Sequence, residues 1–142
     1  MFYCPTRIIF ADNAMQKAKE YISSFGKRAL IVTGKNSAKQ SGALSDTISV
    51  LREADISYVL FNRIAENPTL DIVMEGKSAF LQNNCDFVIG IGGGSPVDSA
   101  KAISLAAANS LNRDEIYNTS VFKKAYPILA IPLTAGTGTE VT

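Results

Sequence analysis

Three consecutive glycines, Gly92, Gly93 and Gly94, followed by Ser95 and Pro96, are the residues of this chain whose types and spacing most clearly point to chemistry. Glycine lacks a Cβ, so the backbone there can turn sharply and approach a ligand closely. Serine is favoured at a helix N-cap and proline at the first helical position, so a helix is expected to begin at Ser95. The free N–H groups and the positive dipole end of such a helix predict an anion-binding turn suited to a pyrophosphate.

The same glycines have a simpler interpretation as a strand-to-helix turn that binds nothing, because glycine also serves tight turns. Asp98 has a simple interpretation too, as a first-turn acid that stabilises the helix dipole by roughly 0.3–1 kcal/mol. The glycines follow an apolar run that reads as a buried parallel strand. Ligands bind beyond the carboxyl ends of such strands, and this position favours the anion site.

The elements that position this turn alternate along the chain. Buried strands are expected over residues 29–33, 56–61, 87–91 and 128–131, and helices over residues 13–25, 42–54, 69–83 and 95–109. Residues 7–10 are expected to form a short antiparallel edge strand, and residues 112–124 a loop with a short turn of helix. The pattern predicts an α/β fold: a Rossmann-like parallel sheet with helices on both faces, plus a short N-terminal edge strand or hairpin.

The ends of the strands would meet at one edge of this sheet. Residues 34–37 follow the first buried strand, Asn67 follows the second by a short loop, and residues 92–95 and 134–137 follow the third and fourth. These segments carry glycines, small residues and hydrogen-bonding side chains, with almost no apolar bulk. Because ligands bind at that edge in such folds, the four segments together predict a cleft of nucleotide size.

The composition is that of one globular domain, with 142 residues, 46% hydrophobic and 19% charged. A formal net charge of +1 argues against a nucleic-acid or membrane-surface partner attracted by bulk charge. No apolar run reaches the roughly 18 residues of a membrane span, and the N-terminus lacks the pattern of a signal peptide. A cytoplasmic location is therefore expected.

The chain contains no histidine, which excludes Ser-His-Asp and Cys-His sites and His-ligated metal sites within it. Cys4 and Cys85 are too few for a disulfide framework and lack metal-ligand spacing, so free thiols are expected. We therefore expect no catalytic residue and no metal ligand among these residues.

Two long motifs carry a resemblance to a known family. Residues 92–101 read GGGSPVDSAK, and residues 131–142 read IPLTAGTGTEVT. In this order they resemble the iron-containing, or group III, alcohol dehydrogenases, and residues 5–10 and the Asn67-Pro68-Thr69 triplet fit the same family. The resemblance runs from about residue 5 to the last residue. Leu133 departs from it, since the family usually has threonine there.

The resemblance implies reversible hydride transfer between a primary alcohol or aldehyde and a nicotinamide dinucleotide, with iron or zinc as a Lewis acid. The family holds that metal with an aspartate and three histidines in a helical second domain, downstream of these residues. Residues 1–142 are thus expected to be the NAD(P)-binding domain of a homo-oligomeric parent enzyme, inactive alone. The alternatives are a stand-alone nucleotide-binding module, or a fragment of a glycerol dehydrogenase or dehydroquinate synthase relative.

By the same resemblance, eight residues would line the pyrophosphate and nicotinamide ends of the cofactor or contact it elsewhere: Asn67, Gly93, Gly94, Ser95, Asp98, Thr134, Thr137 and Thr142. The T-x-x-E sequence of residues 137–140 is a capping box that predicts a further helix. The chain ends two residues after this box, which indicates truncation.

The choice between NAD and NADP depends on the residues after the first buried strand. NAD-specific sites usually place an acid against the ribose 2′-hydroxyl, and NAD-preferring members of the family typically have aspartate where this chain has Gly34. The next acid along the chain is Asp46, which is too distant. Gly34, Ser37, Lys35 and Lys39 offer space, a hydroxyl and charge, so NADP is expected over NAD. The alternative is that the two lysines are simply solvated.

Overall fold

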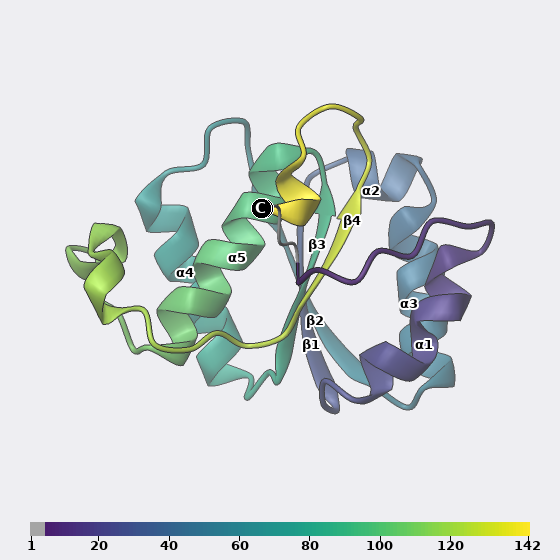
Figure 1. Ribbon diagram of the computed structural model, residues 1–142, viewed down its shortest axis with the longest axis horizontal. Helices are drawn as coiled ribbons and strands as arrows, with labels where there is room; N and C mark the ends of the chain where they lie inside the picture. The colour runs from purple at the N-terminus through teal and green to yellow at the C-terminus, as the bar shows by residue number, and fades with distance from the viewer. Residues whose placement is uncertain (1–4) are drawn as a thin grey trace.

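The structure, a computed structural model, describes residues 5–142, and these residues form one sheet with helices on both sides (Figure 1). The four strands lie in the order β2-β1-β3-β4, and each neighbouring pair is parallel. Their bounds are β1 Arg28–Gly34, β2 Ser57–Ile64, β3 Phe87–Gly92 and β4 Ile128–Pro132. The predicted α/β fold with a Rossmann-like parallel sheet is confirmed.

The helices match the predicted alternation, with one addition. The α-helices are α1 Ala14–Ser23, α2 Ser37–Gln40, α3 Ala43–Glu53, α4 Leu70–Gln82 and α5 Gly94–Ala108. Short 3-10 helices follow at η1 Glu115–Tyr117, η2 Thr119–Val121 and η3 Thr139–Val141. Helix α2 was not predicted, because four residues are too few to show a helical period.

Two hydrophobic cores flank the sheet because its central strands are buried on both faces. On one face, α1, α2 and α3 pack through side chains such as Ile22 and Leu51 against Ile31 of β1. On the other face, α4 and α5 pack through side chains such as Phe80 against Leu30 of the same strand. Successive residues of a strand point to opposite faces, so a strand buried on both sides reads as a continuous apolar run.

A glycine of β3 lets α5 lie directly on the sheet. A Cβ added at Gly90 would lie 2.9 Å from the Cβ of Ala100 and 3.1 Å from the Cα of Val97. This close approach fixes the start of α5 beside the carboxyl end of β3, where the glycine turn lies.

The predicted N-terminal edge strand is wrong, because residues 5–10 form no strand. Ile8 is 67% exposed and Phe10 is 99% exposed, and only Ile9 between them is partly buried, against the core under α1 and α3. The segment is instead held partly by Arg7, whose guanidinium carbon lies 4.2 Å from the centroid of the Tyr21 ring.

Two predicted helix starts also need correction. Helix α5 begins at Gly94 with Gly93 as its N-cap, so Ser95 lies inside the first turn instead of capping it. The T-x-x-E sequence forms only the 3-10 helix η3, whose N-cap is Gly138 with no side-chain capping bond. By contrast, the predicted cap at Thr69 is confirmed, since its side chain accepts a hydrogen bond from the N–H of Ile72 at 3.5 Å.

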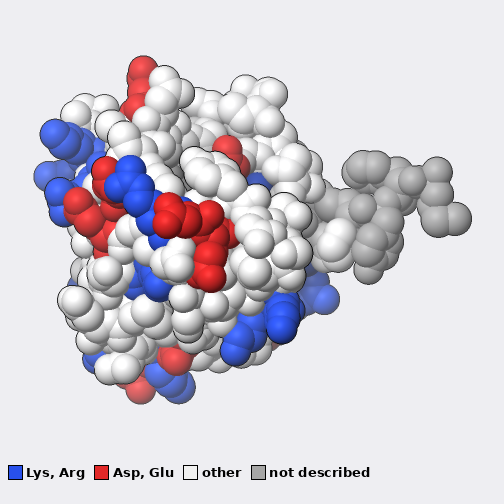
Figure 2. Space-filling view, turned by 90° about the vertical axis from the view of Figure 1, so that its left-hand side faces the viewer, with Lys and Arg blue, Asp and Glu red and all other residues white. Residues whose placement is uncertain are grey.

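The surface over α4 carries charges of both signs. Figure 2 shows Lys and Arg side chains intermixed with Asp and Glu on this face. Two of the ion pairs there join Arg63 to Glu75 and Arg113 to Asp71, and all four side chains are largely exposed. Exposed pairs of this kind contribute about 0–1 kcal/mol to stability.

No helix within residues 5–142 has both the length and the apolar character that crossing a membrane requires.

Candidate functional site

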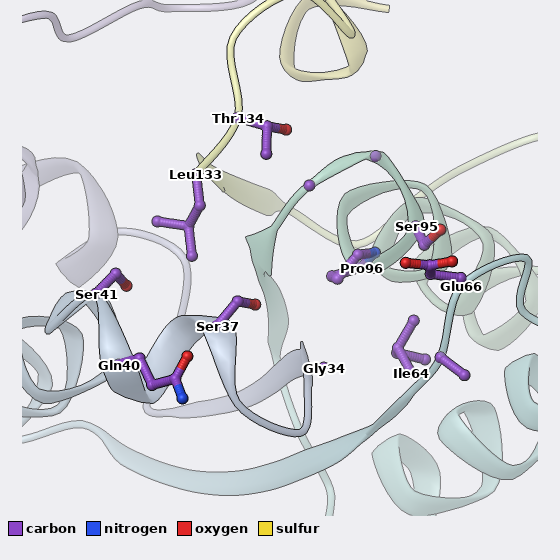
Figure 3. Close-up of a pocket in the computed structure, with 13 residues that line it drawn as sticks. Gly34, Ser37, Gln40, Ser41, Ile64, Glu66, Ser95, Pro96, Leu133 and Thr134 are labelled. Carbon is purple, nitrogen blue, oxygen red and sulfur yellow. The ribbon is translucent and has the colours of Figure 1, made fainter.

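A cleft of about 730 Å³ opens at the carboxyl ends of the strands (Figure 3). It lies between the turn from β1 to α2, the end of β2, the glycine turn after β3 and the segment after β4. Its lining consists of glycines, hydroxyl and amide side chains, apolar side chains and one acid: Gly34, Ser37, Gln40, Ser41, Ile64, Ala65, Glu66, Gly93, Gly94, Ser95, Pro96, Leu133 and Thr134.

The strand register brings these segments together. Gly34 pairs with Ile64 across β1 and β2 after a register shift, so both strands end at the same edge of the cleft. On the other side, the N–H of Leu133 donates a hydrogen bond of 2.8 Å to the carbonyl of Gly92, which ties the segment after β4 to the glycine turn. The predicted meeting of the strand ends is therefore confirmed.

At Gly92 and Gly93 the glycine turn leaves little room for a Cβ. Gly92 has a φ of +148°, and a Cβ there would lie 2.6 Å from Cγ of Pro96. A Cβ on Gly93 would lie 3.3 Å from the Thr134 hydroxyl oxygen. Gly93 therefore faces Thr134 with little room between them, whereas a Cβ on Gly94 would find only ordinary contacts, the nearest at 3.8 Å from Thr137.

Helix α5 presents an uncapped N-terminus to this cleft. In the described chain, no side chain makes a capping hydrogen bond at its N-cap, Gly93. The first N–H groups of a helix lack partners within the helix, and its dipole places positive partial charge there. The arrangement can therefore bind an anionic group through backbone N–H donors.

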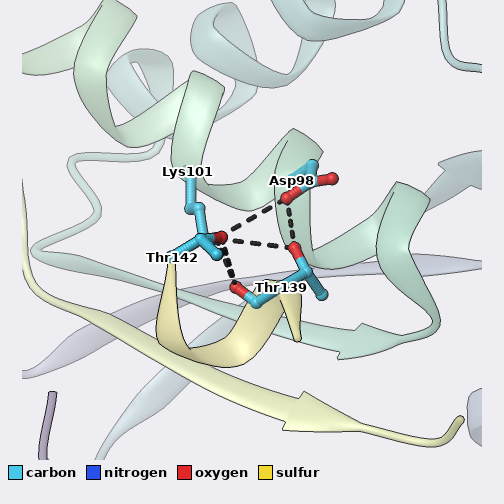
Figure 4. Close-up of polar contacts among 4 residues, drawn as sticks. All are labelled: Asp98, Lys101, Thr139 and Thr142. Atoms are coloured by element: carbon cyan, nitrogen blue, oxygen red, sulfur yellow. Dashed lines mark hydrogen bonds and ion pairs between the residues drawn. The ribbon is translucent and has the colours of Figure 1, made fainter. Parts of the chain in front are cut away.

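A second polar cluster lies beside the glycine turn and joins α5 to η3 (Figure 4). The Thr139 hydroxyl donates to Oδ1 of Asp98, and the Lys101 ammonium donates to the carbonyl of Thr139. Lys101 also donates to the Thr142 hydroxyl at 2.9 Å and pairs with Asp98 at 3.6 Å. These contacts hold residues 139–142 against α5.

The structure brings about half of the sequence-predicted cofactor residues into the cleft. Those that line it are Gly34, Ser37, Gly93, Gly94, Ser95 and Thr134. Those that do not line it are Lys39, Asn67, Asp98, Thr137 and Thr142. Asp98 and Thr142 belong to the cluster of Figure 4, and Thr137 lies over Gly94.

Lys39 and Asn67 lie outside the lining of the cleft. Lys39 is exposed on α2, and Asn67 is an exposed residue with a φ of +51° that directly follows Glu66 of the cleft. The binding roles of all these residues remain predictions.

Sequence reasoning missed seven residues that line the cleft: Gln40, Ser41, Ile64, Ala65, Glu66, Pro96 and Leu133. Gln40 and Ser41 enter it through the short helix α2, which gave no periodic signal. Ile64 to Glu66 could have been found from their place at a strand end, immediately before Asn67. Leu133 was noticed only as a departure from the family pattern.

Cys85 does not line this cleft. Cys85 is free and buried, and burial raises the pKa of its thiol to about 11. It therefore stays protonated at neutral pH, as an inert core residue. Cys4 lies outside the described residues.

Comparisons with known proteins agree with this geometry. Residues 5–142 match the iron-containing alcohol dehydrogenase family, and the chain belongs to that family. It is 35% identical over 144 residues to long-chain primary alcohol dehydrogenase AdhA of Thermoanaerobacter ethanolicus, covering 97% of this chain and 36% of that protein. It is 37% identical over 144 residues to the NAD-dependent methanol dehydrogenase of Bacillus methanolicus, covering 99% of this chain and 37% of that protein.

A solved structure gives the same result. An iron-containing alcohol dehydrogenase from Thermotoga maritima superimposes with a TM-score of 0.94 at 42% identity, covering 100% of this chain and 40% of that one. The chain thus spans little more than a third of the curated relatives, for example 36% of AdhA.

Proposed function

We propose that this chain is the dinucleotide-binding domain of an iron-type alcohol dehydrogenase and that its cleft holds a nicotinamide dinucleotide. The observation that carries the proposal is the uncapped N-terminus of α5, which faces a cleft of about 730 Å³ through Gly93 and Gly94. Backbone N–H donors and the helix dipole favour a pyrophosphate there. The NAD-dependent methanol dehydrogenase named above supports a nicotinamide cofactor.

Each end of the cleft has residues suited to one part of the ligand. Gly34 and Ser37 at the end of β1 suit a ribose, Gly93 to Ser95 suit the pyrophosphate, and Thr134 provides a hydroxyl beside them. When bound, the nicotinamide ring supplies the hydride chemistry. The role of this chain is to bind and orient the dinucleotide.

The proposal includes a preference for NADP over NAD, with NAD as the alternative. The turn from β1 to α2 places Gly34 and Ser37 in the cleft and brings no acid from that turn to meet a ribose 2′-hydroxyl. The side chains of Lys35 and Lys39 are exposed and do not line the cleft. Support for NADP therefore comes from the space at Gly34 and the hydroxyl of Ser37, and the charge of the two lysines adds nothing to it.

Residues 5–142 do not fit a catalytic metal. Within residues 5–142, no group of three or more His, Cys, Asp or Glu side chains comes together that could hold an ion. We propose that the iron or zinc of the parent enzyme is bound by another part of that protein. The 142-residue chain alone is proposed to be inactive toward a primary alcohol or aldehyde.

The parent enzyme is proposed to be cytoplasmic and homo-oligomeric. Tyr58 and Leu60 support the second point, because they lie on the edge strand β2 and are 41% and 40% exposed. Apolar side chains on a sheet edge favour association with another chain. Sedimentation analysis of the full-length protein would test it, and a monomer at all concentrations would contradict it.

Calorimetric titration of the chain with NADPH and with NADH tests the main proposal. We expect saturable binding at one site per chain, tighter for NADPH. Absence of binding of either compound would contradict the function, and tighter NADH binding would contradict only the preference.

A further inference from the structure

Glu66 gives the cleft a negative charge that the proposed anionic ligand does not require. Among the lining residues of the described chain, Glu66 is the only one with a charged side chain. None of the Lys or Arg residues within 5–142 lines the cleft with it. Figure 3 shows the Glu66 carboxylate toward the Ser95 and Pro96 side of the cleft.

The fold fixes where this carboxylate lies. Ile64 is 4% exposed and pairs with Gly34, so the chain leaves β2 at the edge of the cleft. Glu66 follows two residues later and is exposed. Its side chain has neither a hydrogen bond nor an ion pair with any residue of the described chain. No ion pair from the described residues therefore offsets this charge.

We propose that Glu66 is a specificity-determining residue of the cleft. Its carboxylate weakens the binding of a dinucleotide more strongly when the dinucleotide carries more negative charge. This inference rests on the proposed function. NADPH carries a ribose phosphate that NADH lacks, so the unpaired carboxylate opposes NADPH more strongly. Glu66 thus limits the preference for NADPH over NADH that the absence of an acid at position 34 allows. Glu66 follows the end of β2, whereas NAD-preferring members of the family typically have their acid at the end of β1.

The test compares dissociation constants for NADPH and NADH in the unmodified chain and in Glu66→Gln. The substitution keeps the size of the side chain and removes its charge. We expect NADPH to bind roughly three- to tenfold more tightly and NADH to change less, with the difference shrinking as salt screens the charge.

Two matched variants separate this effect from general ones. Glu20→Gln changes the net charge equally at an exposed position of α1 outside the cleft, and we expect no change in either constant. Glu66→Asp retains the charge and should retain the ratio of NADPH to NADH dissociation constants found for the unmodified chain.

Each outcome distinguishes the claims. If the unmodified chain binds both compounds and Glu66→Gln leaves the preference for NADPH over NADH unchanged or weakens it, the role of Glu66 is refuted while the proposed function stands. If Glu66→Gln selectively weakens NADH, the carboxylate acts as a hydrogen-bond acceptor for the ribose, and the inference is wrong. If the unmodified chain binds neither compound, both the function and the inference fail.

Discussion

Thr139 donates its hydroxyl hydrogen to the carboxylate of Asp98, 41 positions earlier in the chain. This bond joins η3 to the first turns of α5, beside the glycine turn. One carboxylate oxygen of Asp98 is engaged there, whereas Oδ2 lies 4.0 Å from where a Cβ of Gly94 would be. Asp98 therefore positions the loop over Gly94 in this structure, and a direct contact with a cofactor remains a prediction.

Lys101 is the centre of this cluster, and its removal should loosen η3. Lys101→Met keeps most of the side-chain volume but loses donors to Thr139 and Thr142 and the ion pair with Asp98. We expect the free energy of unfolding to fall by about 1–2 kcal/mol, as measured by denaturant titration. Hydrogen exchange at residues 139–142 should accelerate as well.

Lys17→Met is the matched control, since Lys17 is exposed on α1. It should leave both the unfolding free energy and the exchange rates unchanged. Equal effects of the two variants would show that Lys101 does not hold η3.

Asp86 connects the start of β1 to the start of β3. Its Oδ2 accepts hydrogen bonds from the backbone N–H groups of Lys27 at 2.7 Å and Arg28 at 2.9 Å. Asp86→Ala would leave both donors unpaired, so we expect a loss of roughly 2–3 kcal/mol in unfolding free energy. Asp12→Ala, at an exposed position of the N-terminal segment, should change it by less than about 0.5 kcal/mol. A small effect of Asp86→Ala would show that water replaces the carboxylate.

The sequence predicted the sheet well because burial on both faces leaves a direct pattern. Residues 29–33 and 87–91 are almost entirely apolar, and they lie in the central strands β1 and β3. The N-terminal segment shows why this reasoning fails at edges. Residues 7–10 are mostly apolar, but a strand forms only where a partner strand pairs with it, and pairing is not a local property of the sequence.

The candidate site was predictable where it depends on one segment. The glycine turn was found from residues 92–95 alone, although the helix begins one residue before Ser95. This occurs because Gly93 takes the extended N-cap conformation, with φ −78° and ψ −158°. Glu66 was missed although it directly precedes the predicted Asn67 at the end of a strand, and the pairing of Gly34 with Ile64 is what brings it to the cleft.

Cys85 should react slowly with thiol reagents and should make stability depend on pH in the alkaline range. Burial raises its pKa from 9.0 to about 11. Above pH 9 the unfolded chain releases the thiol proton while the folded chain retains it, so the unfolding free energy falls as pH rises from 9 toward 11.

A Cys4→Ser background leaves Cys85 as the sole thiol for measuring this. At pH 8, modification should be complete only after denaturant is added. Cys85→Ala should flatten the pH dependence between 9 and 11, and rapid modification of the folded chain would contradict the assignment.

Gly94 tests the pyrophosphate site with little risk to the fold. A Cβ there meets only ordinary contacts, 3.8 Å from Thr137 and 4.0 Å from Asp98. Gly94→Ala should fold and weaken dinucleotide binding, and Gly94→Val should reduce it at least a hundredfold because the larger side chain fills the phosphate space. Calorimetry measures the binding, and circular dichroism checks the fold. A folded Gly94→Val variant that binds as tightly as the unmodified chain would place the ligand elsewhere.

Gly34 tests the choice of cofactor. Gly34→Asp places a carboxylate at the end of β1, where it would accept a hydrogen bond from a ribose 2′-hydroxyl and repel a 2′-phosphate. We expect the preference to change from NADPH to NADH, with NADPH weakened at least tenfold. A Cβ at this position lies 3.2 Å from the carbonyl oxygen of Ile64, so the substitution also introduces a tight contact. Gly34→Ala carries the same contact without the charge and should weaken both compounds equally. If Gly34→Ala alone reverses the preference, the effect is steric, and the charge of an acid at the end of β1 does not determine the cofactor.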